Sequence, residues 1–211
     1  MAVPTKEELR AALASRHGEE IQQKFEKASV AVCGAGGLGS NVSICLARAG
    51  VGRIKIIDFD TIEPSNLNRQ QYTADQVGLP KAEAMAGNLH KINPYCQVEA
   101  HVMKITPENI PGLFDDVDIV MECFDNPVQK AILVNGVLEN YPGKDLIAAS
   151  GMAGMNSGND IKTRKVARHF YLCGDTVSDV GAGLGLYSAR VMICAAHEAL
   201  KALQLIAGVE D

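Results

Sequence analysis

Short apolar runs alternate with longer amphipathic segments through the first two thirds of the chain. The apolar runs predict strands at 29–33, 53–58, 96–103, 117–123 and 145–150. Segments with apolar residues three and four apart predict helices at 39–49, 80–92 and 127–140. Strands that alternate with helices favour an α/β fold with a Rossmann-like, doubly wound and mostly parallel sheet covered on both faces.

The two ends of the chain depart from this alternation. Residues 5–27 predict an N-terminal helical extension interrupted at Arg16-His17-Gly18. After Gly151 the pattern loosens: 161–173 predicts one or two strands and 181–185 a flexible glycine turn. We therefore expect one domain over 1–211, with the following parts: a helical arm at 1–28, a Rossmann-like core at 29–150, and a crossover segment with a C-terminal helix at 151–211.

The last predicted helix, at about 186–207, is unusually apolar. Its polar residues form one narrow stripe, made of Arg190, His197, Lys201 and Gln204, with Glu198 beside it. A helix that is apolar around most of its circumference is expected to be buried on most sides. Packing on the sheet explains this, and so does a dimer interface along part of the helix.

A glycine-rich turn joins the first strand to the first core helix. The turn reads Gly34-Ala35-Gly36-Gly37-Leu38-Gly39. Strand, glycine turn and helix together set backbone N–H groups and a helix N-terminus against a phosphate. Gly34 permits the tight turn, Gly36 lets the backbone approach the ligand, and Gly39 lets the helix pack close to the strand. The sequence therefore predicts a nucleotide site formed by Gly34, Gly36, Gly37, Leu38 and Gly39.

An acidic residue follows the second predicted strand. Asp58 lies about 20 residues after the glycines, where a carboxylate binds the ribose in this fold. The alternative is that Asp58 only ends a strand near solvent. Because the glycines stand at the right distance, we favour the ribose role.

Two cations are predicted at the carboxyl edge of the sheet, where ligands bind in open α/β folds. Arg69 is the one cation of the long polar loop 58–71, which is either functional or a surface loop with a solvated arginine. Pro80 is expected at the first position of the next helix, so Lys81 falls at the positive end of the helix dipole. A bound polyphosphate would remove that conflict, whereas the alternative is an ordinary surface lysine.

Asp125 follows the strand at 117–123, next to Asn126 and Pro127. Pro127 is suited to open a helix and Asn126 to cap it, which leaves Asp125 free to face the ligand cleft. A carboxylate there suits Mg²⁺ near phosphates, bound through water, although Asp125 could also be a second capping acid. Two cations and a magnesium carboxylate favour ATP over a nicotinamide dinucleotide, because attack of an anion on an α-phosphate requires charge neutralisation.

Composition and charge narrow the range of binding partners, cellular locations and metals that we expect. The 211 residues carry a net charge of −5, so general nucleic-acid binding has no electrostatic support. The charged N-terminus is no signal peptide, and no apolar run is long enough for a membrane span. The six cysteines form no CxxC pair and the five histidines show no ligand spacing, so we expect free thiols in a reducing cytoplasm and no structural zinc.

The motifs GxGGLG, DxDxI…SNLNRQ, GxPKA and FDN together resemble the ThiF/MoeB/HesA group of ubiquitin-activating-like adenylyltransferases. The resemblance covers about 16–207. The short length, SRHG and KTRKVARHFYLCGD look most like a short ThiF-type protein linked to thiamine biosynthesis. It implies a homodimer that binds Mg-ATP. Such a protein adenylates the C-terminal glycine carboxylate of a small ubiquitin-like sulfur carrier protein that ends in Gly-Gly.

The resemblance also implies roles for individual residues. Asp58, with Asp60, would hold the ribose side of the nucleotide, and Asp125 would organise Mg²⁺ and the α-phosphate. The phosphates would be contacted by Asn66, Arg69 and Lys81. An arginine of the partner subunit would enter the same site, and Arg16 matches it best, with Arg10 as the alternative.

Two departures from the family pattern limit which properties of the family are expected in this chain. The CxxC pairs of larger, zinc-containing members are absent. The cysteine that forms a persulfide or thioester in some members is matched by Ser178, with Cys173 nearby. We interpret Cys173 as structural, because no neighbouring base is recognisable in the sequence.

Other functions compete with this reading. The acceptor could be a molybdopterin-type carrier or a tRNA-base carboxylate, since 162–169 is locally basic. A nicotinamide-dependent dehydrogenase is disfavoured, because none of the five tyrosines begins a Tyr-x-x-x-Lys motif and no room remains for a substrate domain. A non-catalytic, nucleotide-binding regulatory dimer is disfavoured by the presence of Arg69, Lys81 and Asp125 together.

Overall fold

The computed structural model describes residues 3–209, and within them seven strands form one sheet. In spatial order the strands are β3 (Gln97–His101), β2 (Arg53–Ile57), β1 (Ser29–Cys33), β4 (Ile119–Glu122), β5 (Asp145–Ala149), β7 (Phe170–Gly174) and β6 (Lys162–Ala167). All neighbours pair in parallel except β6 and β7, which are antiparallel. The predicted α/β, Rossmann-like fold is confirmed.

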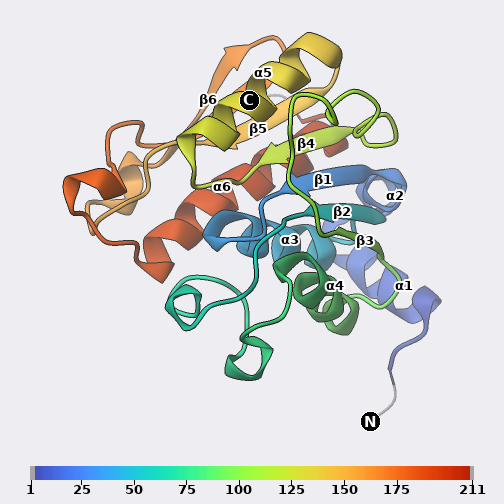
Figure 1. The fold of residues 1–211 in the computed structure, drawn as a ribbon. Helices are drawn as coiled ribbons and strands as arrows, with labels where there is room; N and C mark the ends of the chain where they lie inside the picture. Colours follow the sequence, from blue (N-terminus) through green and yellow to red (C-terminus); the bar gives the residue numbers. More distant parts are fainter. Residues whose placement is uncertain (1–2, 210–211) are drawn as a thin grey trace.

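Helices cover both faces of the sheet (Figure 1). They are α1 (Lys6–His17), α2 (Glu19–Lys27), α3 (Gly37–Ala49), α4 (Lys81–Ile92), α5 (Pro127–Asn140) and α6 (Ser188–Ala207). Alternate residues of each strand enter two cores: Val30 and Val32 pack with α3 and α6, whereas Ala31 and Cys33 pack with α5. This two-sided burial explains why the strands read as continuous apolar runs.

The N-terminal arm is two helices near the amino ends of the strands (Figure 1). Thr5 and Glu8 form a reciprocal cap at the start of α1. Gly18, with φ of 91°, separates the helices where the sequence predicts an interruption. Helix α2 buries Phe25, while α1 has no buried residue. The arm therefore lies at the end of the sheet opposite the predicted ligand edge.

Helix α6 corrects one expectation. Charged residues lie on its buried side: Arg190, Glu198 and Lys201 are 4%, 0% and 5% exposed. Small and apolar residues of α6 share that side and join the core, whereas Met192, Ile193 and Leu200 are 45%, 38% and 57% exposed. Burial on most sides was thus wrong for a single chain, because α6 packs one face on the sheet and leaves apolar side chains of the opposite face in solvent.

Two helix boundaries also differ from the prediction. Helix α4 begins at Lys81, and Pro80 is its N-cap, because Pro80 is extended and bridges Thr61. Helix α3 begins at Gly37 and so includes part of the glycine turn. In residues 3–209, no helix has the length and apolar character needed to cross a membrane.

Candidate active site

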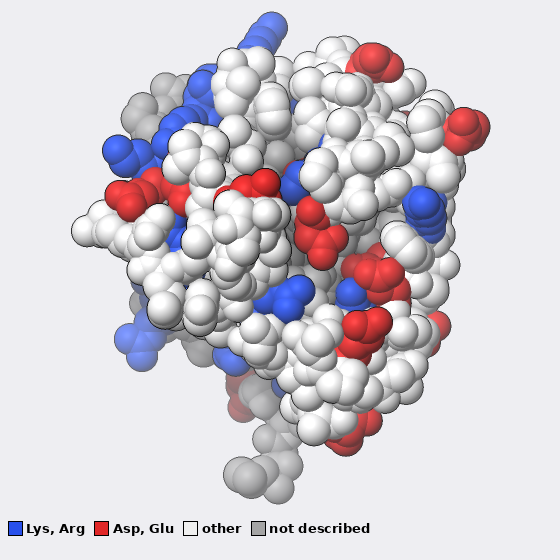
Figure 2. All heavy atoms as spheres, turned by 60° about the vertical axis from the view of Figure 1, so that its left-hand side comes forward, with Lys and Arg blue, Asp and Glu red and all other residues white. Residues whose placement is uncertain are grey.

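A cavity of about 740 Å³ lies at the carboxyl edge of the parallel strands. Lysine, arginine, aspartate and glutamate side chains surround a hollow on this side of the molecule (Figure 2). Most of the predicted site residues line it: Gly34, Gly36, Gly37, Leu38, Asp58, Asp60, Arg69, Lys81 and Asp125. The structure therefore brings together residues as far apart in the sequence as Gly34 and Asp125, which are separated by 91 positions.

The glycine turn forms the floor of the cavity. Gly34 has φ of 94°, and a Cβ atom there would lie 2.9 Å from the carbonyl oxygen of Cys123. At Gly36 the nearest atom to a Cβ would be 3.7 Å away, so this side of the turn is open. Gly39 lies outside the cavity lining that the described residues form. Its Cβ would meet the Gly34 carbonyl oxygen at 1.8 Å, so glycine permits the close contact of α3 with the turn.

Asp58 ties the glycine turn to the end of β2. Its carboxylate accepts hydrogen bonds from the backbone N–H of Ala35 at 2.6 Å and of Asp60 at 2.8 Å. The side chain is 6% exposed. Burial raises the pKa of Asp58, although both backbone bonds and the charge of Lys81 oppose the rise. The result is a rigid acceptor at the cavity edge, suited to a hydroxyl donor.

Lys81 is a buried cation at the start of α4. Its Nζ atom lies 2.9 Å from Asp60, whose side chain is half exposed. The Lys81 backbone N–H also donates to the Asp60 carbonyl oxygen. Asp60 thus supplies the negative charge that the N-terminal end of α4 favours. A phosphate ligand would meet Lys81 already ordered by this pair.

The loop after β2 positions Arg69 beside the cavity. The Arg69 guanidinium donates to the Ser65 carbonyl at 3.3 Å and to the Asn68 side chain at 3.0 Å. Asn66 is buried and its side-chain oxygen accepts from the Glu63 N–H at 3.0 Å, which stabilises the short turn Pro64–Asn66. Asn66 is not in the cavity lining formed by residues 3–209, so its predicted phosphate contact has no geometric support here.

Asp125 is free in the cavity, as its predicted role requires. Asn126 caps α5 by accepting from the N–H groups of Val128 and Gln129, and Pro127 opens the helix. Asp125 is exposed and makes no hydrogen bond or ion pair within the described chain. One unpaired carboxylate beside a phosphate-sized space fits Mg²⁺, which is held in such sites by one or two carboxylates and the substrate phosphates.

The cavity also contains residues that the sequence did not indicate. Lys130 of α5 donates to Glu122 at 2.7 Å and to the Ala149 carbonyl at 2.9 Å, so it joins the ends of β4 and β5. Burial raises the pKa of Glu122, and Lys130 opposes that rise. Lys104 lies 5.8 Å from the Phe59 ring centroid. A lysine in the first turn of a helix and an exposed loop lysine carry no sequence signal that separates them from surface residues.

Neither arginine of the arm lines the cavity that the described residues enclose. Arg10 is paired with Glu19 and Glu26 in its own chain. Arg16 is exposed and has no ion-pair partner in the part of the chain that the structure describes. Any role of Arg16 in the cavity thus requires a second subunit.

All six cysteines, which lie within residues 3–209, are free thiols. Burial raises the pKa of Cys173 to about 12, and the residue lies in β7 outside the cavity lining of the described chain. Ser178 lines the cavity instead. In these residues no three His, Cys, Asp or Glu side chains are grouped to hold a metal ion.

Comparison with known proteins places this site in a family. The ThiF family model matches residues 9–211. The adenylyltransferase and sulfurtransferase uba4 of Emericella nidulans is 37% identical over 64% of this chain and 28% of its own length. The sulfur carrier protein adenylyltransferase of Thermus thermophilus is 42% identical over 58% of this chain and 47% of its own. The matches therefore span less than half of either relative.

Among solved structures, the E. coli tRNA N6-threonylcarbamoyladenosine dehydratase TcdA in complex with ATP is similar over its whole length. The TM-score is 0.87 and the identity 25%, with 98% of each chain covered. Fold and site together define an α/β protein of the Rossmann-like type with a glycine-floored cavity at the carboxyl edge of its sheet. The chain belongs to the ThiF family.

Proposed function

We propose that this ThiF-family adenylyltransferase binds Mg-ATP and adenylates the C-terminal Gly-Gly carboxylate of a small ubiquitin-like sulfur carrier protein. The observation that carries the proposal is the convergence of Arg69, Lys81 and the unpaired Asp125 on one glycine-floored cavity. In the reaction a carboxylate oxygen attacks the α-phosphorus of ATP. The new O–P bond forms as the bond to the β-phosphate bridging oxygen breaks, and pyrophosphate leaves with that electron pair.

Each residue has a part in that step. The rigid Asp58 carboxylate accepts the ribose hydroxyls, and Asp60 orients the Lys81 side chain. Lys81 and Arg69 neutralise the phosphates, because the attacking group and the substrate are both anions. Asp125 would hold Mg²⁺, which supplies further positive charge to the phosphates. Phosphate contact by Asn66 stays a prediction.

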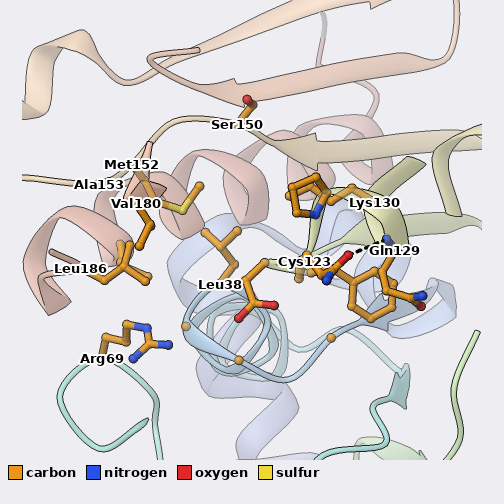
Figure 3. A pocket seen from close by; sticks show the side chains of 18 of the residues that line it. Leu38, Arg69, Cys123, Gln129, Lys130, Ser150, Met152, Ala153, Val180 and Leu186 are labelled. Atoms are coloured by element: carbon orange, nitrogen blue, oxygen red, sulfur yellow. Dashed lines mark hydrogen bonds between the residues drawn. The ribbon is translucent and has the colours of Figure 1, made fainter. Parts of the chain in front are cut away.

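The cavity has two walls under this proposal. The nucleotide wall is formed by Gly34, Gly36, Gly37, Asp58, Arg69 and Lys81. The acceptor wall is formed by 150–153 and 176–180, together with Leu186, on the side where Met152, Ala153 and Val180 gather in Figure 3. A volume of about 740 Å³ is in the range of ligand sites that enclose most of a small molecule.

The named relatives support a protein acceptor. The matched Thermus protein is named for sulfur carriers, and we place the present chain in thiamine thiazole synthesis by its resemblance to short ThiF-type proteins. The whole-length similarity to TcdA favours one alternative, in which the acceptor is the carboxylate of a modified tRNA base. Both readings keep the adenylation step and differ only in the acceptor.

We further propose that the protein acts as a homodimer in which Arg16 enters the partner's cavity. The exposed apolar side chains of α6, Met192, Ile193 and Leu200, form a stripe that a second subunit would cover. Mixing inactive Arg16→Ala and Lys81→Ala proteins tests this. Random exchange of subunits would restore about a quarter of wild-type activity through one intact site in each mixed dimer. No recovery in mixed dimers would contradict a contribution in trans.

The experiment that tests the function is ATP–pyrophosphate exchange with and without a carrier protein that ends in Gly-Gly. Carrier-dependent exchange is expected, and a carrier lacking the last glycine is the control. Exchange with an N6-threonylcarbamoyladenosine-containing tRNA instead would select the alternative acceptor. Nucleotide binding measured separately, without exchange for any acceptor, would contradict the adenylation proposal.

A further inference from the structure

The segment 175–187 forms part of the acceptor wall and buries little of its own side-chain surface. Val177 is 82% exposed and Val180 is 53% exposed. Thr176 has φ of 65°, a left-handed conformation that is unfavourable for a β-branched residue. Apolar packing therefore does not hold the segment in place, and other contacts must do so.

The contacts that hold it converge on one buried ion pair. Arg190, in the first turn of α6, lies 2.6 Å from the Asp175 carboxylate, and the two side chains are 4% and 3% exposed. The other Asp175 oxygen accepts from the N–H groups of Val177 at 2.9 Å and Ser178 at 2.8 Å. Asp175 thus fixes the start of the segment, and Arg190 fixes Asp175 to the helix.

Arg190 also reaches the loop that continues from the other half of the acceptor wall, 150–153. Its second terminal nitrogen donates to the carbonyl oxygens of Asn156 at 2.5 Å and Ser157 at 2.6 Å. One guanidinium therefore connects α6, the end of β7 and the loop after β5. The planar fork of arginine places donors on two separate terminal nitrogens, one for the carboxylate and one for the two carbonyls, whereas lysine presents its three donors from a single nitrogen.

The backbone is built around the same junction. Gly151 has φ of 83°, and a Cβ there would lie 2.1 Å from the Asp175 carboxylate. Gly174 has φ of 129°, and its Cβ would lie 1.9 Å from the Ser150 carbonyl oxygen. The Asp175 and Thr176 N–H groups donate across this crossing to Gly151 and Ser150. Glycine at both positions allows the two wall segments to touch.

The nucleotide wall has no share in these contacts. Its residues are anchored by Asp58, by the Asp60–Lys81 pair and by the turn itself. Burial would raise the pKa of Asp175, but hydrogen bonds from Ser178, Val177 and Arg190 bring it down to about 2. The pair is therefore charged at neutral pH and available as a fixed anchor.

We propose that Asp175 and Arg190 are a positioning pair that holds the acceptor wall, and so sets the affinity for the carboxylate substrate without contacting the nucleotide. This inference rests on the proposed function for its catalytic consequence. The structural part, that one ion pair orders 175–187, can be tested without any acceptor.

The first test is hydrogen–deuterium exchange of Arg190→Lys and Asp175→Asn proteins. Both substitutions keep the approximate size of the side chain. The amides of Val177 and Ser178 are expected to exchange at least tenfold faster than in the wild type, while amides of 38–42 stay unchanged. Asp116→Asn is the control, because it weakens an ion-pair cluster with Lys55 and Arg53 at the opposite end of the sheet. Unchanged exchange at both amides would overturn the inference, whatever the catalytic result.

The second test is the kinetics of ATP–pyrophosphate exchange with the Gly-Gly carrier. In Arg190→Lys the KM for the carrier is expected to rise tenfold or more, with the KM for ATP within twofold of wild type. Asp116→Asn should change neither KM. If both KM values rise together, or the carrier KM stays within twofold, the pair has no acceptor-specific role. Absence of exchange in the wild type would count against the proposed function alone, since the deuterium result decides the structural part.

Discussion

The nucleotide wall and the acceptor wall of the cavity are built in different ways. The first is a continuous turn at the end of a buried strand, with Asp58 accepting two backbone N–H groups and Lys81 ordered by Asp60. The second is two segments that cross at glycines and are joined through Arg190. The glycine turn and Asp58 of the first wall carry a recognisable sequence motif, whereas no motif marks the contacts that hold the second. Substitutions should therefore have separable effects on the two walls.

The largest expected effect is in the nucleotide wall. Lys81→Ala should lower ATP–pyrophosphate exchange by about 10²- to 10³-fold, because it removes a buried cation that neutralises charge in the transition state. The fold should persist, since the Asp60 carboxylate is half exposed and water can solvate it. Lys91→Ala, on the exposed last turn of the same helix, is the matched control and should retain full activity. Wild-type exchange in Lys81→Ala would remove this wall from the mechanism.

A second prediction concerns protein stability and compares the substitution of glycine by alanine at two places. One is Gly39, beside the glycine turn of the nucleotide wall, and the other is Gly87, in α4. Gly39→Ala places a Cβ 1.8 Å from a backbone oxygen and should destabilise the protein by about 3 kcal/mol. Gly87→Ala, inside α4 with no atom within 4 Å of the new Cβ, should stabilise it by about 0.5–1 kcal/mol. Urea unfolding measures both. Equal and small effects would mean that the glycine turn adapts and is not rigid.

The contrast between the walls also explains what the sequence could predict. The positions of the core strands along the chain, the glycine turn and Asp58 follow from periodicity and spacing within short windows. The sequence predicts that Asn126 caps the helix and that Asp125 is therefore not needed as a cap. Asn126 is the N-cap of α5 in the structure. Lys130 was not predictable, because its role depends on Glu122 and on the Ala149 carbonyl of another strand.

Helix α6 is a second place where the sequence predicts the pattern but not the contacts. Periodicity identifies the polar stripe, but does not say that charged residues of α6 are buried beside its apolar core residues. Charged side chains usually face solvent, but here Asp175 pairs with Arg190 while the Tyr171 ring lies 5.1 Å from Lys201 Nζ. These partners, which lie in β7 or directly after it, allow the charged residues to be buried. The contact of Arg190 with two loop carbonyls has no sequence signal at all.

The last prediction compares two buried ionisable residues of α6, of which, within residues 3–209, Arg190 is ion-paired and Glu198 is not. Glu198 is fully buried, one of its oxygens has no partner in the described chain, and the Cys123 sulfur lies 4.0 Å from the other. Burial raises the pKa of Glu198 well above its ordinary value. The folded state therefore keeps a proton that the unfolded state loses above about pH 4.5, and wild-type stability should fall as pH rises.

Glu198→Gln removes that titration while keeping the shape of the side chain. The stability of the variant relative to wild type should increase by up to about 1.4 kcal/mol for each pH unit above pH 4.5, until the folded-state pKa is reached. Urea unfolding at pH 5, 6 and 7 measures the difference, in which the contributions of other groups cancel. Glu139→Gln, on the exposed side of α5, controls for the lost charge. A difference that is constant with pH would mean that Glu198 is ionised in the fold.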